Sequence, residues 1–267
     1  MFPGFELFGK YYSSYMLTAL AGLFTAGPLA VHNYKKRGGS DISMIFVLLF
    51  GGIGCAVGMH LLYGITNIQY WSLLFGAGSF EEFWNNAQMI FGGSVFYGGL
   101  LGGLAGGFLS VRYQKLEPWL VADCAAPSIA LFHMFGRIGC FLGGCCYGVE
   151  WEHGVTFTHS LIEGANGVPR VPVQLYEAGL ELALFLALLI MLRKGWLKNR
   201  LLAVYLMVYA VGRFTLEFWR GDDYRGFLFG LSTSQLISIA VFIAVPVFLI
   251  VTKIRGNNIR QHRTING

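Results

Sequence analysis

The chain has 267 residues, of which 55% are hydrophobic and only 12% are charged. Because a soluble domain carries about 25% charged residues, this composition excludes an ordinary soluble domain and indicates a protein embedded in a membrane. The net charge of +5 would suit a nucleic-acid partner, but the basic residues are confined to particular connections, which argues against nucleic acid. The first twelve residues, MFPGFELFGKYY, lack the basic start and the small-residue cleavage site of a signal peptide.

Several apolar runs are long enough to cross about 30 Å of hydrocarbon as helices. We predict an all-α integral membrane protein with a single domain, in which residues 13–252 form the core and residues 253–267 form a basic cytoplasmic tail. The seven predicted transmembrane helices cover residues 13–31, 42–63, 89–111, 119–141, 174–193, 201–218 and 234–252.

The distribution of lysine and arginine predicts the orientation of these helices. Basic residues gather in alternate connections, at 35–37, 112–115 and 193–200, and in the tail after residue 252. The opposite connections hold few of them: Lys10, Arg170, Arg220 and Arg225. The positive-inside rule therefore places the N-terminus outside and the C-terminus in the cytoplasm.

The two long connections, 64–88 and 142–173, are external in this orientation. The first is rich in aromatic residues, which favours an interfacial belt, with a lid or a lipid-entry rim as the alternative. The second contains Pro169 and Pro172, is too long for a plain turn, and is expected to form a small external head.

Glycines follow two rows on the helix predicted at 89–111, each at a spacing of four residues. One row is Gly98, Gly102 and Gly106, and the other is Gly99, Gly103 and Gly107. The pattern favours close packing of helix backbones. Gly98 and Gly99, next to Tyr97, would also allow a substrate to approach the backbone. No preceding strand supports a dinucleotide-binding motif.

Polar residues inside the spans meet at one level, toward the outer leaflet. Arg137 is the most informative, because an arginine within a span costs about 3 kcal/mol on insertion scales and usually faces a polar cavity. Arg213 and Glu217 lie one turn apart on a second span, and Gln174, Tyr176 and Glu177 begin a third. Two arginines at one level suit a phosphate, because their forked donors match its oxygens.

The alternative is an internal network that only ties helices together, through pairs such as Arg137 with Glu177 or Arg213 with Glu217. Buried pairs contribute little net stability, which makes this interpretation weaker for the whole set. His60 and His133 are expected to be packed, hydrogen-bonded residues.

Four ordered motifs resemble those of the bacterial prolipoprotein diacylglyceryl transferase family. The stretch GRIGCFLGGCCYG (136–148) resembles the family signature, and FYGGLLG (96–102) resembles its HGGL element. VPVQLYEA (171–178) resembles its P-x-Q-L-Y-E element, and RFTLEFWRGDD (213–223) resembles its R-F-x-x-E-F-x-R-x-x-D element. The segment LSTSQLIS (231–238) fits the last span, and Tyr15 is a weaker match in the first.

The resemblance implies a seven-span inner-membrane enzyme without a metal or nucleotide. Such enzymes move the diacylglyceryl group of phosphatidylglycerol to the lipobox cysteine of a prolipoprotein, and glycerol phosphate leaves. Arg137 matches the family's lipid-binding arginine, and Arg213 and Glu217 match a second arginine and its nearby glutamate. With Tyr97, these are the expected catalytic residues. The expected substrate-binding residues are Arg137, Gly98, Gly99, Gln174, Tyr176, Glu177, Tyr15 and Cys145.

Three positions depart from the family pattern. The histidine of the HGGL element is Tyr97 here, the asparagine after GRIG is Cys140, and the glutamate in the second half of the signature is Cys145. Tyrosine is a poor base at neutral pH, so either another group takes the proton from the thiol, or the chemistry shifts toward phosphate stabilisation, or the acceptor differs. The candidate bases are Glu217, Glu177, His60 and His133.

Of the five cysteines, Cys140, Cys145 and Cys146 fall within seven residues. Small apolar packing residues are the simplest interpretation. A disulfide from Cys140, a zinc site with His153 or His159, and a reactive thiolate at Cys145 or Cys146 are the alternatives.

Two other functions remain open at this point. A divergent family member could pass the lipid group to a different acceptor, which the replaced histidine and glutamate would favour. A transporter or flippase would not be an enzyme, and it predicts paired broken helices that the sequence does not show.

Overall fold

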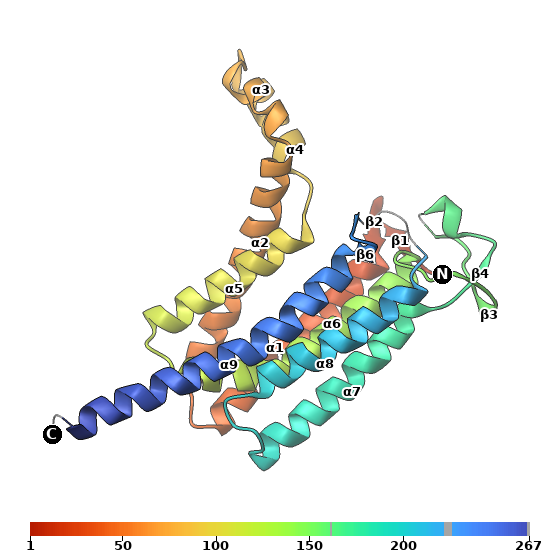
Figure 1. Ribbon diagram of the computed structural model, residues 1–267. Helices are drawn as coiled ribbons and strands as arrows, with labels where there is room; N and C mark the ends of the chain where they lie inside the picture. Colours follow the sequence, from red (N-terminus) through yellow and green to blue (C-terminus); the bar gives the residue numbers. More distant parts are fainter. Residues whose placement is uncertain (161, 222–225, 266–267) are drawn as a thin grey trace. The chain divides into compact units, whose positions relative to one another are not determined.

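The computed structural model describes residues 1–160, 162–221 and 226–265. The chain is mostly helical and divides into two compact units (Figure 1). The first unit contains Met1–Ala30 and Ala122–Gly267, and the second contains Val31–Val121. The boundaries between the units fall inside α1 (Ser14–Lys36) and near the start of α6 (Pro118–Gly143).

Among its described residues, the first unit contains five long helices and three pairs of antiparallel strands. Its helices are α1 (Ser14–Lys36), α6 (Pro118–Gly143), α7 (Val173–Lys194), α8 (Leu201–Leu216) and α9 (Thr233–Ile265). Helices α7, α8 and α9 pack in succession, and α6 runs beside them (Figure 1). Strand β1 (Gly4–Leu7) pairs with β2 (Lys10–Ser13), β3 (Glu150–Thr156) with β4 (Pro169–Arg170), and β5 (Phe227–Leu228) with β6 (Leu231–Ser232). Short 3-10 turns occur at η2 (Glu163–Ala165) and η3 (Glu217–Trp219).

The second unit is a helical hairpin with an insertion. Helices α2 (Asp41–Thr66) and α5 (Phe96–Tyr113) form the hairpin, and η1 (Ile68–Tyr70), α3 (Ser72–Phe75) and α4 (Phe80–Phe91) lie between them in the chain. The glycine row of α5 fits against α2: a Cβ added at Gly102 would lie 2.1 Å from the carbonyl oxygen of Gly54, and one at Gly98 would lie 2.2 Å from that of Gly58. The predicted backbone packing of this row is therefore confirmed.

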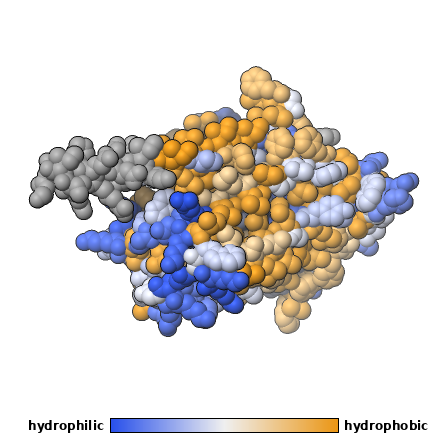
Figure 2. Space-filling view, turned by 60° about the horizontal axis from the view of Figure 1, so that its bottom comes forward, coloured by the Kyte–Doolittle hydropathy of each residue, from blue (hydrophilic) through white to orange (hydrophobic). Residues whose placement is uncertain are grey.

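Six helices are long and apolar enough to cross a membrane within the described residues: Ser14–Lys36, Asp41–Thr66, Pro118–Gly143, Val173–Lys194, Leu201–Trp219 and Thr233–Thr252. They match six predicted spans to within a few residues, except that the first continues five residues further. Apolar side chains cover much of the face seen in Figure 2, and large apolar side chains of these helices, such as Phe24, Val57 and Phe248, are exposed. Without lipid around them, such surfaces would be unstable in water.

The predicted 89–111 helix is the main difference. Residues 89–91 end α4, and α5 begins only at Phe96, because Gly92, Gly93 and Ser94 interrupt the helical backbone. With 18 residues, α5 would span about 27 Å, and its six glycines lower its apolar content. A seventh transmembrane span therefore stays a prediction, as do the single domain and the orientation of the termini.

The predicted head between α6 and α7 folds around its own small core. Tyr147, Phe157 and Ala165 are buried together, and Phe141 and Ile162 pack against them. The guanidinium of Arg170 stacks 4.6 Å from the ring of Tyr147. The short strands were missed by the all-helical prediction, and the external location of this head stays a prediction. Asp222, Asp223 and Arg225 lie outside the described residues.

Candidate active site

A buried ion pair joins α6 to α7. Nη2 of Arg137 lies 2.9 Å from Oε1 of Glu177, and this carboxylate also accepts a hydrogen bond from the Tyr209 hydroxyl on α8, at 2.8 Å. The Glu177 side chain is buried, whereas that of Arg137 is 17% exposed. Within the described part of the chain, no hydrogen bond engages Nη1 of Arg137, and the side chain is partly exposed.

A second set of contacts lies one helical turn away from the first, again between α6, α7 and α8. Nδ1 of His133 is 2.6 Å from Oε1 of Glu181, and the Tyr205 hydroxyl lies 3.4 Å from the same oxygen. Nε of Arg137 donates to Nε2 of His133 at 3.3 Å. Because this nitrogen accepts a hydrogen bond, the imidazole carries its proton on Nδ1 and donates it to Glu181. The prediction that His133 is a packed, hydrogen-bonded residue is confirmed.

The second arginine sits at the end of α8. Nη1 of Arg213 lies 2.8 Å from Oε2 of Glu217, one turn later, and Nη2 donates to Oγ of Ser234 on α9 at 3.0 Å. Both charged side chains are at least nine-tenths buried. Arg213 and Arg137 both lie close enough to Glu177 for their charges to act on it, so the two arginines belong to one polar cluster.

The ion pairs considered in the sequence as an alternative are thus both present. That the cluster also binds a ligand stays a prediction. The candidate bases in this unit already hold partners: Glu177 with Arg137, Glu217 with Arg213, and His133 with Glu181. His60, in the second unit, binds the carbonyl oxygens of Phe91 and Gly93 through Nδ1 at 2.9 and 2.8 Å, but it is exposed rather than packed.

The end of α6 turns the chain back on itself. The amide of Gly144 donates to the carbonyl of Phe141 at 3.2 Å, and the amide of Cys145 donates to that of Cys140 at 3.1 Å. Gly144 has a φ of 76°. This pair of bonds, with a left-handed glycine after the helix, is the Schellman motif. The GG pair in the sequence therefore ends the helix and folds Cys145 over Cys140.

Helix α7 fixes this turn through its first residues. Nε2 of Gln174 donates to the carbonyl oxygen of Cys145 at 2.6 Å, and Gln174 is buried. Glu177 lies three residues further along α7, so one helix face holds both the turn and Arg137.

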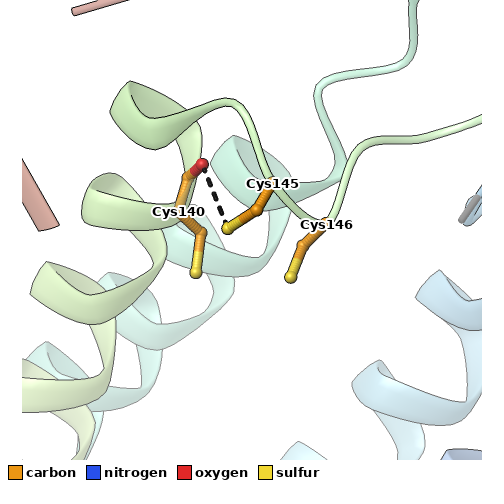
Figure 3. A group of neighbouring side chains, drawn as sticks. All are labelled: Cys140, Cys145 and Cys146. Carbon is orange, nitrogen blue, oxygen red and sulfur yellow. Dashed lines mark hydrogen bonds between the residues drawn. The ribbon is translucent and has the colours of Figure 1, made fainter. Parts of the chain in front are cut away.

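The three clustered cysteines come together at this turn (Figure 3). The sulfur atoms of Cys140, Cys145 and Cys146 all lie within 4.8 Å of one another. All five cysteines of the chain are free, so the disulfide alternative is not observed. Neither His153 nor His159 joins this group, so the alternative of a zinc site with a histidine is not supported. Hydrogen bonds with Cys140 and Cys145 lower the pKa of the Cys146 thiol, and hydrogen bonds with Cys140 and Cys146 raise the pKa of Cys145.

The remaining predicted site residues are more peripheral. Tyr15 lies at the start of α1, where Gly139 of α6 allows the helices to approach, and it is half exposed. Tyr176 points away from the buried face of α7 and is also half exposed. Tyr97, Gly98 and Gly99 belong to the second unit, where Gly98 contacts Gly58 of α2. Their approach to a lipid stays a prediction.

Sequence reasoning missed Glu181, Tyr205 and Tyr209. The available signal was a repeat of polar residues at a spacing of four on three spans. His133 and Arg137 repeat on α6, and the other two pairs are Glu177 with Glu181 on α7 and Tyr205 with Tyr209 on α8.

Fold and site together define a class of protein: a multi-pass membrane protein with a buried, arginine-centred polar cluster among apolar helices, suited to an anionic lipid headgroup. The sequence profile of one family, described as prolipoprotein diacylglyceryl transferase, matches residues 5–251. The chain belongs to the prolipoprotein diacylglyceryl transferase family.

Individual relatives agree with this assignment. A phosphatidylglycerol–prolipoprotein diacylglyceryl transferase of Clostridium tetani is 34% identical over 247 residues, covering 91% of this chain and 95% of the relative. The second such transferase of Clostridium perfringens is 33% identical, covering 94% and 95%. The transferase of Dehalococcoides mccartyi is 32% identical and covers 81% of each chain. Membership of an enzyme family favours a transferase over the transporter or flippase.

Proposed function

We propose that this chain transfers the diacylglyceryl group of phosphatidylglycerol to the lipobox cysteine of a prolipoprotein, at the outer leaflet of the bacterial cytoplasmic membrane. Arg137 and Arg213 bind the phosphate of the lipid. Glu177 and Glu217 hold the two guanidinium groups in place before the lipid enters. In this proposal the N-terminus lies outside and the C-terminus lies in the cytoplasm, as the basic residues of the connections predict.

One observation carries this proposal: Arg137 of α6 and Arg213 of α8 share one buried polar cluster, and no hydrogen bond among the described residues engages Nη1 of Arg137. In the reaction, the thiol sulfur attacks the glycerol carbon that carries the phosphate. The carbon–oxygen bond breaks, and its electrons go to the phosphate oxygen of the departing glycerol phosphate. Negative charge therefore grows where the two guanidinium groups lie, and fixed donors at such a place lower the barrier most effectively.

The carboxylates offer a reason for choosing phosphatidylglycerol. Oε2 of Glu177 is buried and has no hydrogen-bonding partner among the described residues. A buried acceptor without a donor costs about 1–3 kcal/mol. The headgroup glycerol carries two hydroxyl donors, and one of them can satisfy this oxygen while the phosphate binds Arg137. Phosphatidic acid, which lacks the glycerol, would leave it unsatisfied.

The test uses the purified full chain in liposomes that contain phosphatidylglycerol, together with a lipobox peptide. Mass spectrometry is expected to show a diacylglyceryl peptide and glycerol phosphate, with no product from a peptide whose cysteine is replaced by serine. Arg137→Ala and Arg213→Ala should each lower kcat by about 10²–10³. The matched control is Arg193→Ala, at the far end of α7, which should transfer normally. Normal transfer by both site variants would exclude the proposed phosphate site.

A further inference from the structure

The cysteine cluster has a donor set and a spacing that the phosphate site does not explain. Three sulfurs come within 4.8 Å of one another from a helix end and the turn after it. A zinc ion bound at about 2.3 Å from each sulfur needs sulfurs about 3.8–4.0 Å apart. The sulfurs would have to approach one another by at most about 1 Å, which small rotations of the cysteine side chains can supply. Figure 3 shows the three side chains gathered where α6 ends.

We propose that Cys140, Cys145 and Cys146 bind a zinc ion, and that the acceptor cysteine of the prolipoprotein becomes its fourth ligand. The proposal rests on the proposed function, because it assigns the step that activates the acceptor thiol. Three protein ligands with one open position are the pattern of catalytic zinc sites, whereas structural sites use four. Thiolate donors select zinc or copper(I) and disfavour magnesium or calcium.

The backbone holds the three thiols in position without the ion. The Schellman bonds place Cys145 over Cys140, and Gln174 fixes the carbonyl of Cys145. Cys146 adopts a left-handed backbone with a φ of 61°, which costs of order 1–3 kcal/mol for a residue other than glycine. On its far side, the turn is held by the bond from the Gly148 amide to the Val171 carbonyl, at 3.0 Å. A site prepared in this way loses little entropy when the ion binds.

The surrounding charges suit a metal–thiolate group. Three thiolates and one zinc ion carry a net charge of −1, and the fourth thiolate makes it −2. The charges of Arg220 and Arg137 both act on Cys146. The same arginine that we assign to the lipid phosphate therefore lies beside the thiolate that would attack the lipid, and the two reactants meet at Arg137.

A bound zinc ion would activate the acceptor thiol, a task for which the departures from the family pattern leave no histidine at position 97. Tyr97 stands where the resemblance expects a histidine, and the carboxylates near Arg137 already hold partners. A thiol that coordinates zinc is deprotonated outright. The acceptor thiol loses its proton to water as it binds, its sulfur then attacks the glycerol carbon, and the carbon–oxygen bond to phosphate breaks. The resulting thioether is a weak ligand, so the product leaves the ion.

Metal binding is measured first, without reference to activity. The purified full chain is stripped with a chelator and titrated with Zn²⁺ or Co²⁺, and bound metal is determined by mass spectrometry and cobalt absorption. About one ion per chain and sulfur-to-cobalt charge-transfer bands are expected. Serine at Cys140, Cys145 or Cys146 should weaken binding by more than the roughly 10–100-fold that the loss of an outer-shell partner costs. The matched controls are Cys55→Ser and Cys124→Ser, which should bind normally, and absence of cobalt–thiolate bands in the wild-type protein would overturn the proposal.

The second measurement tests the open position. A lipobox peptide should change the visible cobalt bands, and its serine analogue should not; an identical response to both peptides would overturn the assignment of the fourth ligand. Arg137→Ala should retain the cobalt spectrum while losing transfer, so loss of the phosphate site is distinguishable from loss of the metal site. Full transfer by a metal-free Cys140→Ser, Cys145→Ser, Cys146→Ser variant would overturn the zinc proposal and leave the transferase function standing.

Discussion

The ion pair between Arg137 and Glu177 allows a structural use of these residues to be separated from a functional one. Removing one partner of a buried pair costs about 3–5 kcal/mol, because an uncompensated charge remains. The two partners are not equivalent here, since Glu177 is buried and Arg137 is 17% exposed. Arg137→Met should destabilise the protein by about 5 kcal/mol, because the buried Glu177 carboxylate loses its closest cation and keeps the Tyr209 hydroxyl. Glu177→Gln should destabilise the protein by about 3 kcal/mol or less. The Arg137 side chain is partly exposed and keeps its hydrogen bond to His133.

The double variant Arg137→Met, Glu177→Gln removes both charges at once. Replacing a whole buried pair with neutral groups of similar volume is often close to neutral, and a glutamine at this position still accepts the Tyr209 hydroxyl. The double variant should therefore recover most of the stability lost by the single variants. Transfer should stay low by about 10²–10³, since the phosphate-binding donor is gone.

Unfolding of the purified protein in mixed detergent micelles, followed by circular dichroism, gives the three free energies. Transfer from phosphatidylglycerol to a lipobox peptide is measured on the same preparations. If the double variant regained both stability and wild-type transfer, Arg137 would serve only to tie α6 to α7, and the phosphate assignment would be wrong.

Two further predictions concern the scaffold. Gly102→Ala should destabilise the α2–α5 hairpin by about 1–3 kcal/mol, because the new Cβ would lie 2.1 Å from the Gly54 carbonyl oxygen; Gly103→Ala, whose Cβ would lie 3.4 Å from the nearest backbone atom, is the control, and equal unfolding free energies for the two variants would refute the packing argument. Asp123→Ala should cost about 0.5–2 kcal/mol, because the Asp123 carboxylate accepts hydrogen bonds from the amides of Asn199 and Leu201, at 2.5 and 2.8 Å, at the start of α8; unchanged chemical unfolding of this variant would show that the start of α8 is held by other contacts.

The apolar helices could be predicted from the sequence because the bilayer sets their length. Six of the seven predicted spans match helices of the structure closely. The remaining span, predicted at 89–111, begins too early. Gly92 and Gly93 resemble the helix-packing glycines that follow them, but they interrupt the helix instead. Of the described strands, all but the seven-residue β3 have only two to four residues. They were missed because strands this short show no clear alternation of polar and apolar residues.

The polar cluster was predictable only in part. Arg137, Arg213 and their glutamates stand out because a charge in a span is costly. Tyr205 and Tyr209 do not, because tyrosine is common in membrane helices and a single hydroxyl carries little signal. Glu181 was overlooked although it repeats Glu177 after four residues. Its role became clear only when α6 placed His133 against it.

The turn after α6 explains why two of the departures from the family pattern belong together. The bonds that form the turn run between backbone groups of residues 140–145, so positions 140 and 145 adjoin whatever side chains they carry. Where the resemblance expects an asparagine and a glutamate, the same turn would bring together an amide and a carboxylate. Here it brings together two thiols and adds Cys146 as a third. The replacements at Cys140 and Cys145 therefore fall on one turn of this chain, where they place sulfur atoms at the positions of an expected amide and carboxylate.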